Sequence, residues 1–382
     1  MKTFAVCLLT CFVFFAGSAF GAPQETKDSV QPYMREIFKN FKELQPYLFS
    51  ESKFSDNRNN AAIQEKLRAL SDLFNDVKSH STNTAEPGFN STLKSINEML
   101  RDASNRFEEG NKGYALWRMR TVSNHCISCH TRFEVDISFI DSEKAPNLPP
   151  FEKGEFYLAT RQFEKAKMEF LKAARSPQAD HSTMDALRKW MVIYTRVRPD
   201  PKDAIKELKF FEKTLTLYPY EKEVISEWLE SLKNWETEKP SKADSLRKAE
   251  NLIRQSIHVQ DDFSNNLGAI ELLRASSLLH KSLEEHNRLS DQDRARALYL
   301  LGLVYSKLPL YFVNELPELF LQQCIREYPG TQNAKRSYRL YEELILLGFT
   351  GSRGTVLPDD VAAQLEELHN LAYGIPRMKD QV

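Results

Sequence analysis

The 382-residue sequence has little glycine, few cysteines and no excess of charge of either sign. Its 13 glycines argue against Gly-rich phosphate-binding loops and against β architectures that need many tight turns. The 52 basic and 53 acidic side chains leave a net charge of −1, so no basic field points to nucleic acid or to an anionic membrane. With 41% hydrophobic and 27% charged residues, the composition is that of a globular chain, and its abundant Leu, Ala, Glu and Lys predict helices.

Recognisable catalytic constellations and long apolar runs are also missing from the sequence. It has no His-Glu-x-x-His motif and no Ser/His/Asp order in an α/β context, and no carboxylate pair stands out from the helical charge background. Beyond the first residues, no apolar stretch reaches the ~20 residues that a bilayer-spanning helix needs. We therefore expect a binding or electron-transfer protein rather than an enzyme, without a transmembrane segment.

The first residues have the pattern of a secretory signal peptide. Lys2 precedes an apolar run from Phe4 to Phe15, and mostly small residues follow up to Gly21. The run is shorter than a spanning helix, and the small residues suit cleavage after Gly21. We predict that residues 1–21 are removed on export and that the mature protein is periplasmic, in a Gram-negative bacterium.

After that cleavage only Cys126, Cys129 and Cys324 remain, which excludes a disulfide framework. Two of them belong to Cys-Ile-Ser-Cys-His at residues 126–130, the CxxCH signature of covalent haem attachment. On a helix these positions share one face, so two thiolates can each add to a haem vinyl group while His130 reaches the iron. We predict one haem c on this motif. Cys324, on an apolar helix face, is interpreted as a buried thiol.

Four amphipathic patterns precede or contain this motif, joined by polar loops at 49–60, 78–89 and 108–113. Their apolar positions are Met34, Ile37, Phe38, Phe41, Leu44 and Leu48; Ile63, Leu67, Leu70, Phe74 and Val77; Leu93, Ile96, Leu100, Ala103 and Phe107; and Ala115, Met119, Val122, Cys126 and Cys129. The third pattern is expected to open after Asn90 and Ser91, which are good N-cap residues. An antiparallel four-helix bundle over residues 22–140 is the obvious way to bury four apolar stripes.

This arrangement resembles the cytochrome c′ family, whose members carry CxxCH near the end of the fourth helix and hold the haem inside one end of the bundle. The resemblance covers roughly residues 28–136. It depends on the motif at 126–130, on Phe133 soon after it and on Met34 early in the first helix. The chain departs from the family at Glu134, where members often carry a basic residue after the aromatic; here Arg132 precedes the ring.

Bundle geometry adds a candidate for the second axial ligand of the iron. In an up-down-up-down bundle the start of the first helix and the end of the fourth lie together, so Met34 and His130 can face each other across a haem. Six-coordinate relatives use a methionine at this place, which implies Met/His ligation suited to electron transfer. Two alternatives stay open: Met34 only fills the core, or His80, in the loop between the second and third helices, is the ligand.

The chain changes character at about residue 150, where Pro146, Pro149 and Pro150 indicate a linker over residues 141–151. Beyond it, small and aromatic residues follow the spacing of tetratricopeptide (TPR) repeats. The positions are Gly154, Tyr157, Ala166, Phe170 and Ala173, with half-matches at Tyr194, Ala204, Leu208 and Phe211, at Ala249 and Ile253, and at Gly302 and Tyr305. Because small residues let paired helices approach closely, we predict an α-solenoid of TPR-like hairpins over residues 152–375, with a tail at 376–382.

These predictions describe an all-α, exported mono-haem c-type cytochrome whose repeats dock protein partners, redox partners among them. Two alternative functions stay open. The haem could be five-coordinate and bind a diatomic gas, as in cytochrome c′ members without a methionine ligand, or the chain could be a scaffold of an envelope complex in which haem is secondary. The histidines of the repeats have no metal-binding spacing and are interpreted as surface or packing residues: His181, His258, His280, His286 and His369.

Overall fold

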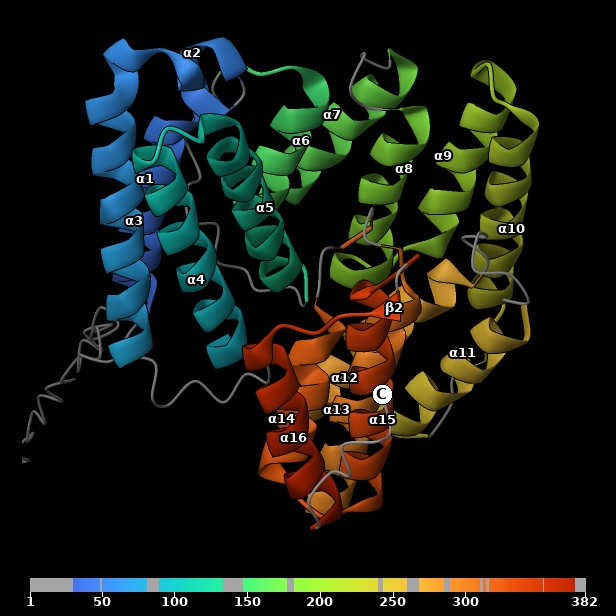
Figure 1. The fold of residues 1–382 in the computed structure, drawn as a ribbon. Helices are drawn as coiled ribbons and strands as arrows, with labels where there is room; N and C mark the ends of the chain where they lie inside the picture. Colours follow the sequence, from blue (N-terminus) through green and yellow to red (C-terminus); the bar gives the residue numbers. More distant parts are fainter. Residues whose placement is uncertain are drawn as a thin grey trace, which may run out of the picture.

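The computed structural model describes residues 30–48, 50–80, 89–132, 147–176, 182–239, 243–259, 268–284, 289–309, 312–313, 316–352 and 354–374. These residues are almost wholly helical, which confirms the all-α prediction (Figure 1). The first group of elements is α1 (Gln31–Leu48), α2 (Glu51–Ser55), the 3₁₀ turn η1 (Asn57–Asn59), α3 (Asn60–His80), α4 (Phe89–Glu108) and α5 (Lys112–His130).

The second group follows from residue 150. Its elements are α6 (Pro150–Ala159), α7 (Phe163–Arg175), α8 (Thr183–Val192), the π-helical segment η2 (Ile193–Val197), α9 (Pro201–Thr214), α10 (Pro219–Glu236), α11 (Ser245–Val259), α12 (Ala269–Glu284), α13 (Asp291–Lys307), α14 (Pro317–Glu327), α15 (Gln332–Gly348), the antiparallel strands β1 (Thr350–Gly351) and β2 (Gly354–Thr355), and α16 (Asp359–Tyr373). Within the described ranges, no helix combines the length and apolarity that crossing a bilayer requires.

The four long helices α1, α3, α4 and α5 pack side by side and share a core of their own (Figure 1). Each contributes a fully buried apolar side chain: Leu44, Leu67, Leu100 and Met119. These are positions of the four predicted apolar stripes, so the 3–4 residue periodicity predicted which faces are buried.

Lys112 establishes how the ends of these helices lie. Its Nζ donates to the carbonyl of Ser55 at 3.0 Å and to the side-chain oxygens of Asn57 and Asn60, each at 2.7 Å. The start of α5 therefore lies beside the segment that follows α1. Because α1 and α5 have similar lengths of 18 and 19 residues, the start of α1 and the end of α5 both lie at the opposite end.

The predicted loops of this region are partly helical. Residues 49–60 contain α2 and η1, because Phe54 is fully buried with its ring 5.2 Å from that of Phe107, and Ser50 caps the short helix. The third long helix begins at Phe89, so Asn90 and Ser91 lie in its first turn and not before it. The burial of Phe54 therefore favours a helix in a segment whose polar sequence predicts a loop.

The second group is built from successive packed helices, beginning at Pro150 in the first helical turn, inside the predicted linker. Two predicted small residues occur where helices approach closely. A Cβ at Gly154 would lie 2.6 Å from a ring carbon of Phe170, and a Cβ at Gly302 would overlap the side chain of Leu321. A larger residue at either position would force the neighbouring side chain to move.

The second group does not extend away from the first as a single row. Helices α12–α16 turn back and lie below α5–α8 in Figure 1, and α12 packs against η2. Ile127 of α5 belongs to the large core that runs through the second group as far as Cys324, and Leu316 packs against the core of the first group. Cys324 itself is fully buried, as predicted, with its thiol 3.2 Å from the carbonyl of Ala295.

Candidate functional site

The Cys-Ile-Ser-Cys-His motif forms the last turn of α5, where the predicted helical spacing brings positions 126, 129 and 130 to one face. Cys126 is partly buried, and its sulfur lies 3.6 Å from the carbonyl of Val122 one turn earlier. Burial raises the pKa of this thiol to about 11. The side chain of Cys129 lies outside the described part of the structure.

His130 is oriented by the first helix of the second group. Its Nδ1 hydrogen-bonds to the backbone carbonyl of Ala159. Burial first, and then the charges of Arg161 and Arg132, lower the pKa of the imidazole to about 4, although the hydrogen bond to Ala159 raises it. The ring is therefore neutral near pH 7, and donation from Nδ1 puts the lone pair on Nε2. A neutral imidazole in this tautomer has the form that ligates a metal through Nε2.

The carbonyl that accepts from His130 is available because of the way α6 ends. Gln162 N bonds to Tyr157 O at 2.8 Å and Arg161 N bonds to Leu158 O at 3.2 Å, the pattern of a Schellman cap. Arg161 supplies the left-handed residue of this cap with φ 59°, where glycine is usual. The cap satisfies the carbonyls of residues 157 and 158, and the last-turn carbonyl of Ala159 accepts from His130.

Met34 lies at the same end of the first group as the motif. It is half-buried and packs against the core of that group. Phe38, one turn later on the same helix face, has its ring 5.8 Å from that of Phe156 in α6. The structure thus brings the Met34 end of α1 and the His130 end of α5 to the same helix, α6. Iron ligation by Met34 stays a prediction.

His80, the alternative ligand, is the last residue of α3 and not part of a loop. Since α3 starts beside Lys112 and runs to the opposite end, its last turn lies at the motif end of the first group. The side chain of His80, like all of Phe133 and Glu134, lies outside the described part of the structure.

Sequence reasoning missed a set of buried polar residues beyond α5, which we call the interior polar cluster: Arg132, Arg196, His280 and Tyr305. Their exposed fractions are 0%, 2%, 1% and 3%. The hydroxyl of Tyr305 lies 2.8 Å from His280 Nε2 and accepts from Arg196 Nη2 at 3.3 Å. Burial first, and then the charges of Arg132 and Arg196, holds the pKa of His280 well below its ordinary value. Of the two interpretations given for this histidine, a surface or a packing residue, the structure shows a packing residue. No spacing in the sequence connects His280 with the motif.

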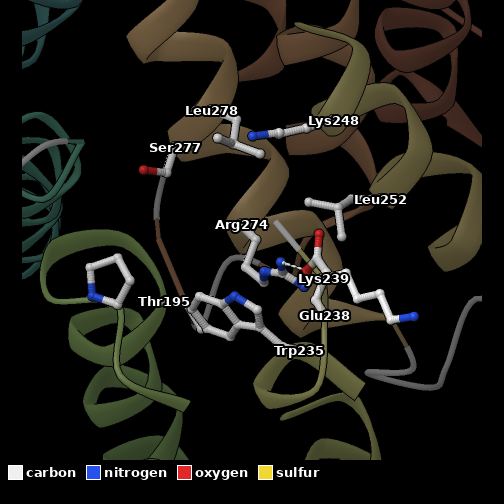
Figure 2. A pocket seen from close by; sticks show the side chains of 10 residues that line it. Thr195, Trp235, Glu238, Lys239, Lys248, Leu252, Arg274, Ser277 and Leu278 are labelled. Atoms are coloured by element: carbon white, nitrogen blue, oxygen red, sulfur yellow. Dashed lines mark hydrogen bonds and ion pairs between the residues drawn. The ribbon is translucent and has the colours of Figure 1, made fainter. Parts of the chain in front are cut away.

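A separate groove of about 330 Å³ lies between η2 and the helices α10–α12 (Figure 2). Its floor combines a large aromatic ring with charge: the guanidinium of Arg274 lies 4.2 Å from the centre of the Trp235 ring and is ion-paired with Glu238. Lys239 and Lys248 also line the groove. The groove can hold an apolar or aromatic group with an acidic neighbour.

No family model, no curated protein and no solved structure matches this chain. Across the described ranges, no three His, Cys, Asp or Glu side chains converge as a metal-binding group.

Proposed function

We propose that this chain is an exported, mono-haem c-type cytochrome that transfers electrons. Haem is attached to Cys126 and Cys129, with His130 as the proximal ligand of the iron and Met34 as the distal one. The observation that carries the proposal is the hydrogen bond from His130 Nδ1 to the carbonyl of Ala159. Metal-ligating histidines ordinarily donate their second ring N–H to a carbonyl or carboxylate in this way.

The chemistry of the residues at the end of α5 fits a haem. A helix face that presents two cysteines and a neutral imidazole offers the donors that covalent attachment and proximal ligation need. A haem bound there with His and Met ligands would supply one-electron chemistry. The chain's own part is to orient the imidazole through α6 and to keep water from it through the burial of the last turn of α5.

We further propose that α1, α3, α4 and α5 form an antiparallel four-helix bundle of the cytochrome c′ type and that the second group is TPR-like. The separate core of the first group supports the bundle. The close approaches at Gly154 and Gly302 support the repeats. In this proposal the second group docks protein partners, and the groove at Trp235 and Arg274 is a candidate contact for a redox partner.

The absorption spectrum of the reduced protein tests the proposed ligands. A low-spin spectrum that carbon monoxide leaves unchanged is the expected result, because both axial positions are filled. A high-spin spectrum that shifts with the gas would contradict electron transfer through Met/His ligation and would favour the gas-binding alternative. A protein without a haem spectrum would contradict both.

A further inference from the structure

Arg196 is a buried cation that lacks an acidic partner among the described residues. Its guanidinium donates one hydrogen bond, from Nη2 to the Tyr305 hydroxyl at 3.3 Å. Its Nε and Nη1 are buried with no hydrogen-bond partner, and the whole residue is 2% exposed. An isolated buried charge costs several kcal/mol unless an opposite charge and hydrogen bonds compensate it.

Other cations of the second group with little exposure do have acidic partners. Arg274 pairs with Glu238, Arg188 Nη1 lies 3.0 Å from a carboxylate oxygen of Asp185, and Lys189 Nζ lies 3.7 Å from one of Glu155. Arg196 differs from these three cations in having no acidic partner among the described residues. Its Nε and Nη1 atoms remain donors without an acceptor, and a guanidinium donates charge-assisted hydrogen bonds to carboxylates.

The backbone that carries Arg196 is unusual as well. Residues 193–197 are π-helical, and Arg198 N bonds to Ile193 O at 2.8 Å, five residues back. Such widened turns are rare and occur frequently at functional sites, where they redirect a side chain. Here the turn places Arg196 in the interior, whereas Arg198 two residues later lies at the surface.

A chain of ring contacts connects Arg196 to the haem motif. The guanidinium of Arg132, two residues after His130, lies 5.6 Å from the centre of the Phe320 ring. That ring lies 5.3 Å from the ring of Tyr305, and the Arg196 guanidinium lies 6.0 Å from the Tyr305 ring. The last turn of α5 and Arg196 therefore belong to one buried neighbourhood, although they come from different groups of helices.

We propose that Arg196 binds a propionate carboxylate of the haem attached at Cys126 and Cys129, with Tyr305 as the residue that positions the guanidinium. This inference rests on the proposed function. In a porphyrin the propionates project from the edge opposite the vinyl groups that receive the thiols, so their partners must come from elements other than the attachment turn. Arg196 is a cation with two hydrogen-bond donors unused, contributed by such an element.

The test measures the midpoint potential and the propionate bands of the resonance Raman spectrum on the haem-loaded full chain. Arg196→Gln removes the buried cation and is expected to lower the potential, because ferric haem is then less disfavoured, and to shift the propionate band. Arg196→Lys should restore most of the potential. Arg198→Gln is the matched control: it removes the same charge from an exposed residue and should change neither quantity.

Tyr305→Phe keeps the ring and removes the hydroxyl that Arg196 bonds, so it serves if Arg196→Gln does not fold. It should shift the potential and the band in the same direction by less. The inference is overturned if Arg196→Gln and Tyr305→Phe leave the band unchanged, or if Arg198→Gln shifts the potential as much as Arg196→Gln. It is also overturned if added chloride or phosphate shifts the midpoint potential of the parent protein but not that of Arg196→Gln, while the propionate band stays unchanged. In that case Arg196 binds a free anion and not the propionate. If any of these results is obtained while the parent protein shows a haem spectrum, only this inference fails. A parent protein without a haem spectrum contradicts the proposed function itself.

Discussion

The two groups of helices contribute different chemistry to the neighbourhood of His130. The first group supplies the CxxCH motif and Met34, beside a mostly aliphatic core of its own. The second supplies the carbonyl that orients the imidazole, and the buried polar residues Arg196, His280 and Tyr305. The CxxCH motif thus comes from the first group, and the acceptor for His130 comes from the second. The candidate site therefore combines residues of both groups of helices.

This division has a consequence for how substitutions should act. Changes to the attachment residues of the first group should abolish or alter the haem signal. Changes deep in the second group, away from α6 and the interior polar cluster, should alter stability and leave the haem signal unchanged.

The largest effect is expected for Cys126→Ser combined with Cys129→Ser. Serine hydroxyls do not add to haem vinyl groups, so covalent haem should be lost entirely, as measured by haem staining after denaturing electrophoresis. Cys324→Ser is the matched control, because Cys324 is a buried thiol of the second group. Haem staining that survives the double substitution would place the attachment elsewhere.

Met34→Ala should open the distal side of the iron while covalent haem is retained. The ferrous spectrum should become high-spin and the midpoint potential should fall, because a thioether ligand favours ferrous iron. Since Met34 is half-buried, stability should fall by about 2 kcal/mol, the low end for such truncations.

Met99→Ala is the control for Met34, because Met99 belongs to the same core with 8% exposure. It should destabilise the protein and leave the spectrum unchanged, and His80→Ala should also leave the spectrum unchanged. If Met34→Ala behaves like Met99→Ala, Met34 is a packing residue and the distal ligand is another group.

Glu227 of α10 should make the stability of the protein pH-dependent. Burial raises the pKa of its carboxyl from 4.5 to about 7, against the effect of the Gly268 amide, which donates to it at 2.9 Å. Because the native pKa lies above the unfolded one, the native state holds the extra proton, and stability should fall as the pH rises from about 4.5 to about 7. The full loss is roughly 3 kcal/mol.

Urea denaturation across that pH range measures this effect. Glu227→Gln keeps an oxygen for the Gly268 amide and carries no charge, so it should remove this part of the pH dependence and leave the haem spectrum unchanged. Glu230→Gln, at an exposed position on the same helix, should not remove it. A Glu227→Gln variant with the parent's pH dependence would show that this carboxyl is ionised in the native state at an ordinary pKa.

The smallest effect compares two helical glycines. Gly154→Ala puts a methyl group against the Phe170 ring and should cost about 1–3 kcal/mol. Gly113→Ala, in the exposed first turn of α5 with no neighbouring atom within 4 Å, should stabilise by up to about 1 kcal/mol. Thermal unfolding of the two variants checks the signs. Equal effects would contradict the close approach of α6 and α7.

Periodicity and motif spacing predict the features of this protein that depend on local sequence. The apolar stripes of the four long helices, the burial of Cys324 and the close approaches at Gly154 and Gly302 are of this kind. So is the helical placement of residues 126–130. In each case neighbouring residues decide the outcome, because helix faces follow from 3–4 residue spacing.

Contacts between residues far apart in the chain could not be predicted in this way. The return of α12–α16 beneath α5–α8 depends on the packing of whole helices, and it is what buries Arg132 against Phe320. The Ala159 carbonyl accepts from His130 at the end of a helix that a Schellman cap closes. Arg161 is the left-handed residue of this cap, and an arginine in the sequence does not predict that conformation. The burial of Phe54 likewise stabilises a short helix in a segment whose polar sequence predicts a loop.

The central claim is that Cys126 and Cys129 carry a covalent haem, and the intact mass of the chain tests it most directly. The protein would be exported in a host that matures c-type cytochromes, purified and measured by mass spectrometry under denaturing conditions. We predict the mass of residues 22–382 plus one haem, and fragmentation that places the haem on the peptide containing residues 126–130. A mass without haem, under conditions in which the host matures another c-type cytochrome, would contradict the account.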